Sequence, residues 1–162
     1  MRSEVLSYGL IGALAIALLF AAFTDIKRRQ IDNWLNAGVA LAAPAFWWAS
    51  GLSLWPGVGI QLGLALATFV VTAGLFAMRM MGGGDVKLLT ALALWVLPAD
   101  FLFLVIVMAL LGGVLTIAIA AWRMALRKQG QAAIPYGIAI ASAGLLTLVD
   151  KSLPMLAANA AG

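Results

Sequence analysis

The chain has 162 residues, of which 65% are hydrophobic and only 10% are charged. Soluble domains normally carry about 25% charged residues, and a soluble fold of this composition would expose large apolar patches that aggregate. The composition therefore predicts a polytopic membrane protein. The chain contains no cysteine and no histidine, which excludes thiol catalysis, disulfides, Cys/His zinc sites and a histidine base.

Six apolar segments are candidates for membrane-spanning helices, because a span needs about 20 mostly apolar residues. Helices are expected because the bilayer interior offers no water to backbone groups, and the apolar runs are continuous rather than alternating as in a β-barrel. We expect one membrane-embedded domain over residues 1–162, with no separate soluble domain. The predicted segments are Val5–Phe23, Trp34–Ser50, Val58–Met78, Val86–Leu97, Phe101–Trp122 and Ile134–Val149.

The basic residues predict the orientation, since Lys and Arg concentrate in cytoplasmic loops. Eight of the ten basic residues fall after the first, third and fifth segments, which makes those connections cytoplasmic and places both termini outside. These eight are Lys27, Arg28, Arg29, Arg79, Lys87, Arg123, Arg127 and Lys128. The net charge of +4 then reflects topology and anionic lipid head groups, and no nucleic-acid partner is expected. The six tryptophans are interpreted as anchors at the membrane interfaces.

Five aspartates are the main candidates for acid–base chemistry. Asp100 and Asp150 lie at predicted outer helix ends and are interpreted as solvated charges. Asp32 lies in the first cytoplasmic loop, where it is expected to cap the second helix. Asp25 ends the first segment, where a carboxylate opposes the helix dipole and adds no stability.

Asp85 begins the fourth segment, where it can serve as the N-cap. It follows the run Gly82-Gly83-Gly84, and three consecutive glycines are expected only where backbone turns tightly or approaches another backbone. The segment after Asp85, about thirteen residues long, reaches only roughly 20 Å. Either the following turn dips into the membrane or Asp85 lies below the cytoplasmic surface.

Topology places Asp25 and Asp85 at the same membrane face and at similar depth. Two neighbouring carboxyls share a proton, so one can activate water while the other protonates a substrate carbonyl. A carboxylate inside a membrane also serves proton-coupled transport. The residues alone leave a catalytic pair and a transporter open as alternatives.

Two short motifs carry a resemblance to a known family. Residues 82–85 contain Gly-x-Gly-Asp, and residues 24–33 contain an aspartate followed by basic residues and Ile-x-Asn. Their order, their helix-end placement and the six-helix plan resemble the type IV prepilin peptidase family. The size resembles its small stand-alone branch, which serves Flp or tight-adherence pili. Ile134-Pro135-Tyr136-Gly137 looks like the Pro-aromatic-Gly element near the start of the family's last helix.

The resemblance implies an aspartic endopeptidase with Asp25 and Asp85 as catalytic residues. Its substrates would be prepilin or pseudopilin precursors, whose leader peptide is removed at the cytoplasmic face of the bacterial inner membrane. The precursor helix and the bilayer are the expected partners, with the pilus assembly machinery as a further one. No cofactor and no metal are expected. The residues expected to support the site are Gly82, Gly83, Gly84 and Lys87.

The sequence departs from the family pattern in two places. The usual Ile-Pro-Asn is Ile31-Asp32-Asn33 here, which makes Asp32 the rival of Asp25 for the first catalytic position. The first cytoplasmic loop is short, and cysteine is absent, whereas methylating members carry a large loop there, so no N-methyltransferase activity is expected. A non-catalytic subunit of a pilus or secretion complex is a further alternative.

Overall fold

The computed structural model describes residues 2–127 and 136–160, and this part of the chain is helical throughout its regular elements. Each of the six predicted segments overlaps one helix, although Lys128, Ile134 and Pro135 lie outside the described residues. The helices are α1 (Arg2–Arg28), α2 (Asn33–Ala49), α3 (Gly59–Ala77), α4 (Gly83–Ala93), α5 (Pro98–Ala125) and α6 (Tyr136–Ala160), with a short turn, η1 (Leu54–Val58), before α3.

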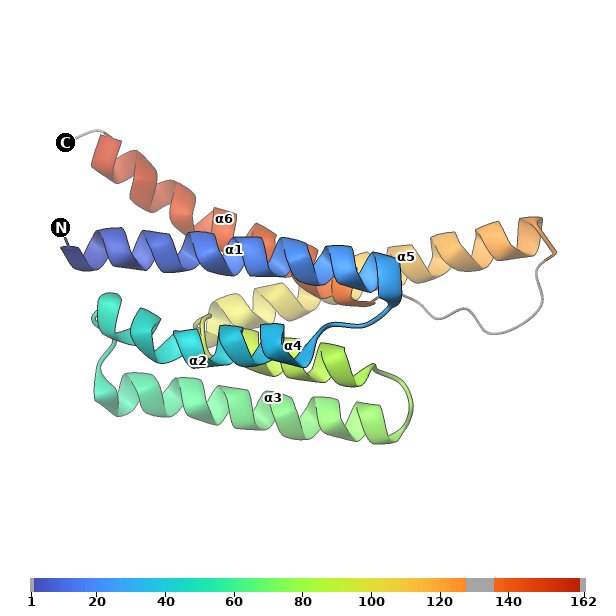
Figure 1. The fold of residues 1–162 in the computed structure, drawn as a ribbon, viewed down its shortest axis with the longest axis horizontal. Helices are drawn as coiled ribbons and strands as arrows, with labels where there is room; N and C mark the ends of the chain where they lie inside the picture. Colours follow the sequence, from blue (N-terminus) through green and yellow to red (C-terminus); the bar gives the residue numbers. More distant parts are fainter. Residues whose placement is uncertain (1, 128–135, 161–162) are drawn as a thin grey trace.

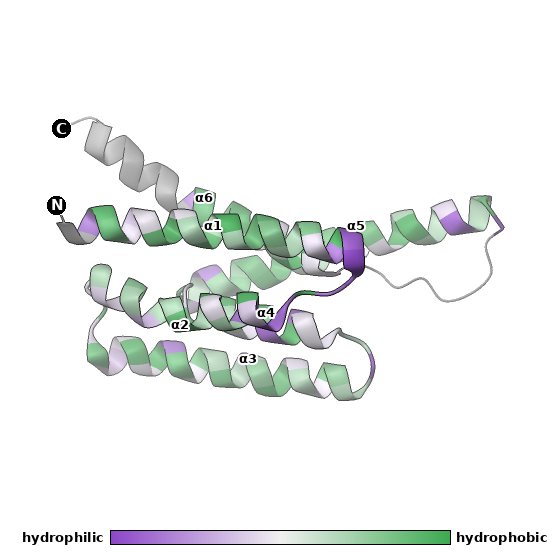
Figure 2. Cartoon of the chain, in the orientation of Figure 1, coloured by the Kyte–Doolittle hydropathy of each residue, from purple (hydrophilic) through white to green (hydrophobic). Residues whose placement is uncertain are grey.

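Three stretches of the described chain are long and apolar enough to cross a membrane. They are Glu4–Arg28, Leu54–Ala77 and Pro98–Ala125, with 25, 24 and 28 residues. Figure 2 shows these helices mostly in green, the colour of hydrophobic residues. Only 11–22% of their most apolar windows is buried inside the protein, so most of these residues form an apolar outer surface. That surface is suited to lipid rather than to water. The other helices are shorter or only partly described, α2 with 17 residues and α4 with 11.

Four helices surround the centre of the molecule, with the two remaining helices outside them. α1 packs against α2 and α6, and α4 packs against the same two helices from the opposite side. α3 covers α4, and α5 covers α6 (Figure 1). The C-terminal end of α1 and the N-terminal ends of α4 and α6 lie toward the same end of this arrangement. Helix ends that carry the two candidate aspartates are thereby brought together.

The turn after α4 is completed by side chains from neighbouring helices. The indole Nε1 of Trp47 donates to the carbonyl of Leu94 at 2.7 Å. The amide of Gln61 donates to the carbonyls of Leu94 and Val96, both at 3.3 Å. Irregular backbone at membrane depth is tolerated where protein groups satisfy it. These bonds tie the turn after α4 to α2 and α3, and they supply what a turn that dips into the membrane, one of the two explanations for the short fourth segment, would require.

Trp95 corrects one expectation. Its side chain is only 7% exposed, and its Nε1 donates to the carbonyl of Val39 at 2.9 Å. The ring also stacks on Phe46, with 5.0 Å between the ring centroids. The interpretation of all six tryptophans as interface anchors is therefore wrong for Trp95, which ties the end of α4 to α2.

Candidate active site

Asp25 lies in the last turn of α1, buried against the beginning of α6. Its side chain is 6% exposed, and a Cβ atom built on Gly137 would stand 2.7 Å from its Oδ2. The backbone N–H groups of Gly137 and Ile138 act on the carboxyl from the first turn of α6. The C-terminal dipole of α1 disfavours a carboxylate, and the N-terminal end of α6 offsets it. α1 does not stabilise the Asp25 carboxylate, as expected from the sequence, and the first turn of α6 provides the N–H groups that do.

Asp85 lies in the first turn of α4, three residues after the N-cap, and is 9% exposed. The prediction that Asp85 is itself the N-cap is wrong, because Gly82 takes that position with extended backbone. The Asp85 side chain folds back, so that a Cβ atom on Gly82 would stand 2.9 Å from Oδ2. The N–H of Gly82 acts on this carboxyl, as in a capping box where an acid reaches back to the N-cap.

The charge of Asp25 acts on the Asp85 carboxyl although the two residues are sixty positions apart in the sequence. The pKa of Asp85 is raised from 3.8 to about 6, because burial and, to a smaller extent, the charge of Asp25 raise it by more than the Gly82 N–H lowers it. Asp85 lies directly before the fourth apolar segment, which begins at Val86, and outside the three helices of spanning length. A buried carboxyl that interacts with a second one is suited to holding a proton near neutral pH.

Gly84 confirms the expectation that the glycine run allows two backbones to approach. A Cβ atom there would stand 3.2 Å from Cβ of Ile31, 3.3 Å from its backbone N and 3.5 Å from its carbonyl oxygen. Gly83 meets only the ring of Phe76, at 3.4 Å. The loop before α2 is therefore packed directly on the first turn of α4 at Gly84.

Two asparagines of α2 also hold this turn. Asn33 was quoted from the sequence only as part of the Ile-x-Asn motif, and Asn36 was missed. Asn36 is buried, and its Nδ2 donates to the carbonyl of Gly84 at 3.4 Å. Asn33 accepts a hydrogen bond of 2.6 Å from Nζ of Lys87. Lys87 was expected to support the site, and the structure directs its exposed side chain to Asn33 rather than to the carboxyl pair. The available signal for Asn36 was an amide within an otherwise apolar helix.

Asp32 occupies the N-cap position of α2, as predicted, but its side chain makes no capping hydrogen bond. Its carboxylate instead pairs with Arg28 at 2.9 Å, and the two side chains are 28% and 53% exposed. The cation that acts on Asp25 is Arg29, which the sequence did not single out from its basic neighbours. The structure thus brings Asp25, rather than Asp32, together with Asp85.

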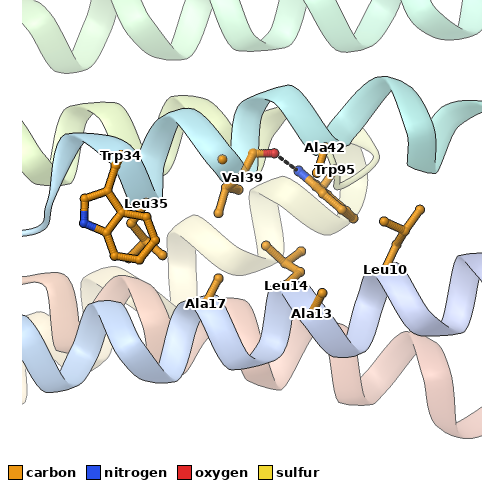
Figure 3. A pocket seen from close by; sticks show the side chains of 10 residues that line it. Leu10, Ala13, Leu14, Ala17, Trp34, Leu35, Val39, Ala42 and Trp95 are labelled. Carbon is orange, nitrogen blue, oxygen red and sulfur yellow. Dashed lines mark hydrogen bonds between the residues drawn. The ribbon is translucent and has the colours of Figure 1, made fainter.

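A separate apolar groove of about 200 Å³ lies between α1 and α2 (Figure 3). Trp34 stands at one end of the labelled side chains and Leu10 at the other. No acidic side chain lines the groove, so the groove itself offers no group for acid–base chemistry. The lining residues are Leu10, Ala13, Leu14, Ala17, Trp34, Leu35, Gly38, Val39, Ala42 and Trp95.

Comparison with known protein families gave a match to the type IV leader peptidase family over residues 12–117, about two thirds of the chain. The matched region includes both Asp25 and Asp85, and it ends before α6. No characterised protein and no solved structure gave a match.

Proposed function

The chain belongs to the type IV leader peptidase family, and from this premise we propose that it is an aspartic endopeptidase of prepilin or pseudopilin precursors. It removes their leader peptide at the cytoplasmic face of the bacterial inner membrane, with Asp25 and Asp85 as the catalytic pair. The observation that carries the proposal is the burial of two interacting carboxyls, one from α1 and one from α4. A passive structural role does not call for such a pair.

The proposed reaction uses one ionised and one protonated carboxyl. The ionised carboxyl removes a proton from water, and the water oxygen attacks the carbonyl carbon of the scissile peptide bond. The protonated carboxyl donates its proton to the carbonyl oxygen, which gives a tetrahedral intermediate. As the intermediate collapses, the C–N bond breaks and the leaving nitrogen takes a proton from the pair. The burial of both carboxyls and the raised pKa of Asp85 support this sequence of steps.

The proposed topology has six membrane crossings, with both termini periplasmic. Its support is the basic character of the connections at the aspartate end, where Arg28, Arg29, Arg79 and Lys87 lie. The far ends of α1 and α6 lie toward the other end of the molecule (Figure 1). The substrate enters as a membrane-inserted helix, the pilus assembly machinery is a further partner, and no methyltransferase activity accompanies the peptidase.

Co-expression with a pilin-type precursor tests the proposal, with leader removal followed as a mobility shift. Asp25→Ala and Asp85→Ala should each abolish cleavage. Asp32→Ala, Asp100→Ala and Asp150→Ala should process the precursor as the wild type does. Full processing by either of the first two variants would rule out the assigned pair.

Two further measurements distinguish the peptidase from two other functions. Proton-linked flux in vesicles, without cleavage of any precursor, would indicate a transporter with a carboxylate relay. Pilus assembly that is fully retained with Asp25→Asn and Asp85→Asn would indicate a non-catalytic subunit.

A further inference from the structure

The first turn of α6 is packed on the Asp25 carboxyl without room for a side chain. A Cβ atom on Gly137 would stand 2.7 Å from Oδ2 of Asp25, 2.9 Å from its Cγ and 2.9 Å from Cδ1 of Ile31. Oδ2 is buried and has no hydrogen-bond partner within the described residues. The orientation of this carboxyl therefore depends on where the backbone of Gly137 and Ile138 lies, because their N–H groups act on it.

The position of that turn is set by α5 through Tyr136. The aromatic ring lies over Gly112, where a Cβ atom would stand 2.9 Å from Cε1 and 3.3 Å from Cδ1 of the ring. The Tyr136 hydroxyl is 3.5 Å from Oγ1 of Thr116, which itself donates to the carbonyl of Gly112 at 2.6 Å. The ring is thus seated in a notch that exists because position 112 has no side chain.

We propose that Gly112, Tyr136 and Gly137 are positioning residues that hold the Asp25 carboxyl in place relative to Asp85. The notch at Gly112 seats Tyr136, Tyr136 fixes the first turn of α6, and Gly137 lets that turn touch the carboxyl. All three act through Asp25 and do not contact the substrate. The kinetic consequence rests on the proposed peptidase function, whereas the effect on the carboxyl does not.

Two adjacent glycines provide a matched pair of variants. Gly112→Ala adds a methyl group against the Tyr136 ring, whereas Gly113→Ala adds the same group where no heavy atom lies within 4 Å. The helix propensity gained is the same at both sites. Displacing a reacting group by about 1 Å can cost about 100-fold in rate. With a membrane-inserted pilin-type precursor in liposomes, Gly112→Ala should lower kcat roughly 10- to 100-fold, with KM within about twofold.

Gly137→Ala tests the contact with the carboxyl itself and should also lower kcat while leaving KM nearly unchanged. Its methyl group meets two neighbours, Asp25 and the end of Ile31. Ile31→Val, compared alone and combined with Gly137→Ala, removes the Cδ1 atom and relieves only the second contact. Because the clash with the carboxyl persists, the double variant should stay as slow as Gly137→Ala. Full recovery would assign the effect to Ile31 and overturn the role of Gly137.

A second readout needs no substrate. The infrared carboxyl bands of Asp25, identified as those lost in Asp25→Asn, should shift in Gly112→Ala and Gly137→Ala and stay in place in Gly113→Ala. Tyr136→Leu empties the notch without a clash and should shift the same bands, which covers the case that Gly112→Ala does not fold. Bands unchanged in both Gly112→Ala and Tyr136→Leu would overturn the proposal. If these bands shift but the wild-type protein cleaves no precursor, the peptidase function is refuted and the positioning of the Asp25 carboxyl is not.

Discussion

Replacing Gly84 by alanine gives the sharpest test of why the glycine run is present. Two of the three atoms nearest the added Cβ, at 3.3 and 3.5 Å, are backbone atoms of Ile31, and the third, at 3.2 Å, is its Cβ. None is the end of a flexible side chain, so either the loop before α2 or the first turn of α4 must move. Overpacking of this kind typically costs about 1–3 kcal/mol. The same displacement moves Asp85, and cleavage should fall by about tenfold or more.

Gly83 is the matched control, one residue earlier in the same turn. A Cβ atom there meets only the Phe76 ring, at 3.4, 3.8 and 3.9 Å. Since alanine is favoured over glycine in a helix by roughly 0.5–1 kcal/mol, Gly83→Ala should be neutral or slightly stabilising. Because both glycines lie in α4, the propensity gain cancels, and unfolding titrations in detergent should place Gly84→Ala about 1–3 kcal/mol below Gly83→Ala. Equal unfolding free energies and equal cleavage rates would refute the close-approach argument.

Three further predictions concern residues around the carboxyl pair and α4. Gln61→Leu removes the side-chain donor to the buried Val96 carbonyl and should lower the free energy of unfolding by about 1–3 kcal/mol, more than Trp47→Phe, in the same titration, because Leu94 keeps one donor in either variant. The pKa of Asp85 is about 6 in the folded protein, compared with 3.8 for the free group, so the folded state binds the proton of this carboxyl more tightly. This contributes at most about 3 kcal/mol to the free energy of unfolding below about pH 4, and the contribution is lost as the pH rises through 6. Asp85→Asn should flatten that loss in unfolding measured between about pH 4 and 7, and an unchanged slope would contradict the assignment. Arg28→Ala breaks only an exposed ion pair with Asp32 and should change stability by less than about 0.5 kcal/mol.

The helices were predictable because long apolar runs without charges have few alternatives in a bilayer. Their ends were less predictable: α1 and α6 run beyond the predicted Phe23 and Val149, to Arg28 and Ala160, whereas α4 stops at Ala93, before the predicted Leu97. Residues 94–97 are as apolar as the helix before them, so their hydropathy does not reveal the break. The break is stabilised by Gln61 and Trp47, and no local pattern connects these residues with the end of α4.

The position of the carboxyl pair was also predictable in part. Topology alone places Asp25 and Asp85 at one face, and the close approach at Gly84 follows from the cost of consecutive glycines. The contact between Asp25 and Gly137 depends on how α6 packs against α1, which spans more than a hundred residues of sequence. Asn36 was missed because a single amide in an apolar helix gives no indication of its partner.

The completed turn after α4 has a mechanical consequence. Three hydrogen bonds from Trp47 and Gln61 fix the far end of this short helix, and Asp85 lies at the other end. Leu94 is nine positions after Asp85, which corresponds to about 14 Å of helix. A tilt of about 10° around the fixed end would carry Asp85 by roughly 2–3 Å, a distance that opens or closes a gap between two carboxyls. Because Ile31 and Asn36 also hold the first turn of α4 at Gly84, the helix is fixed at both ends, and a change at either end would alter the position of Asp85.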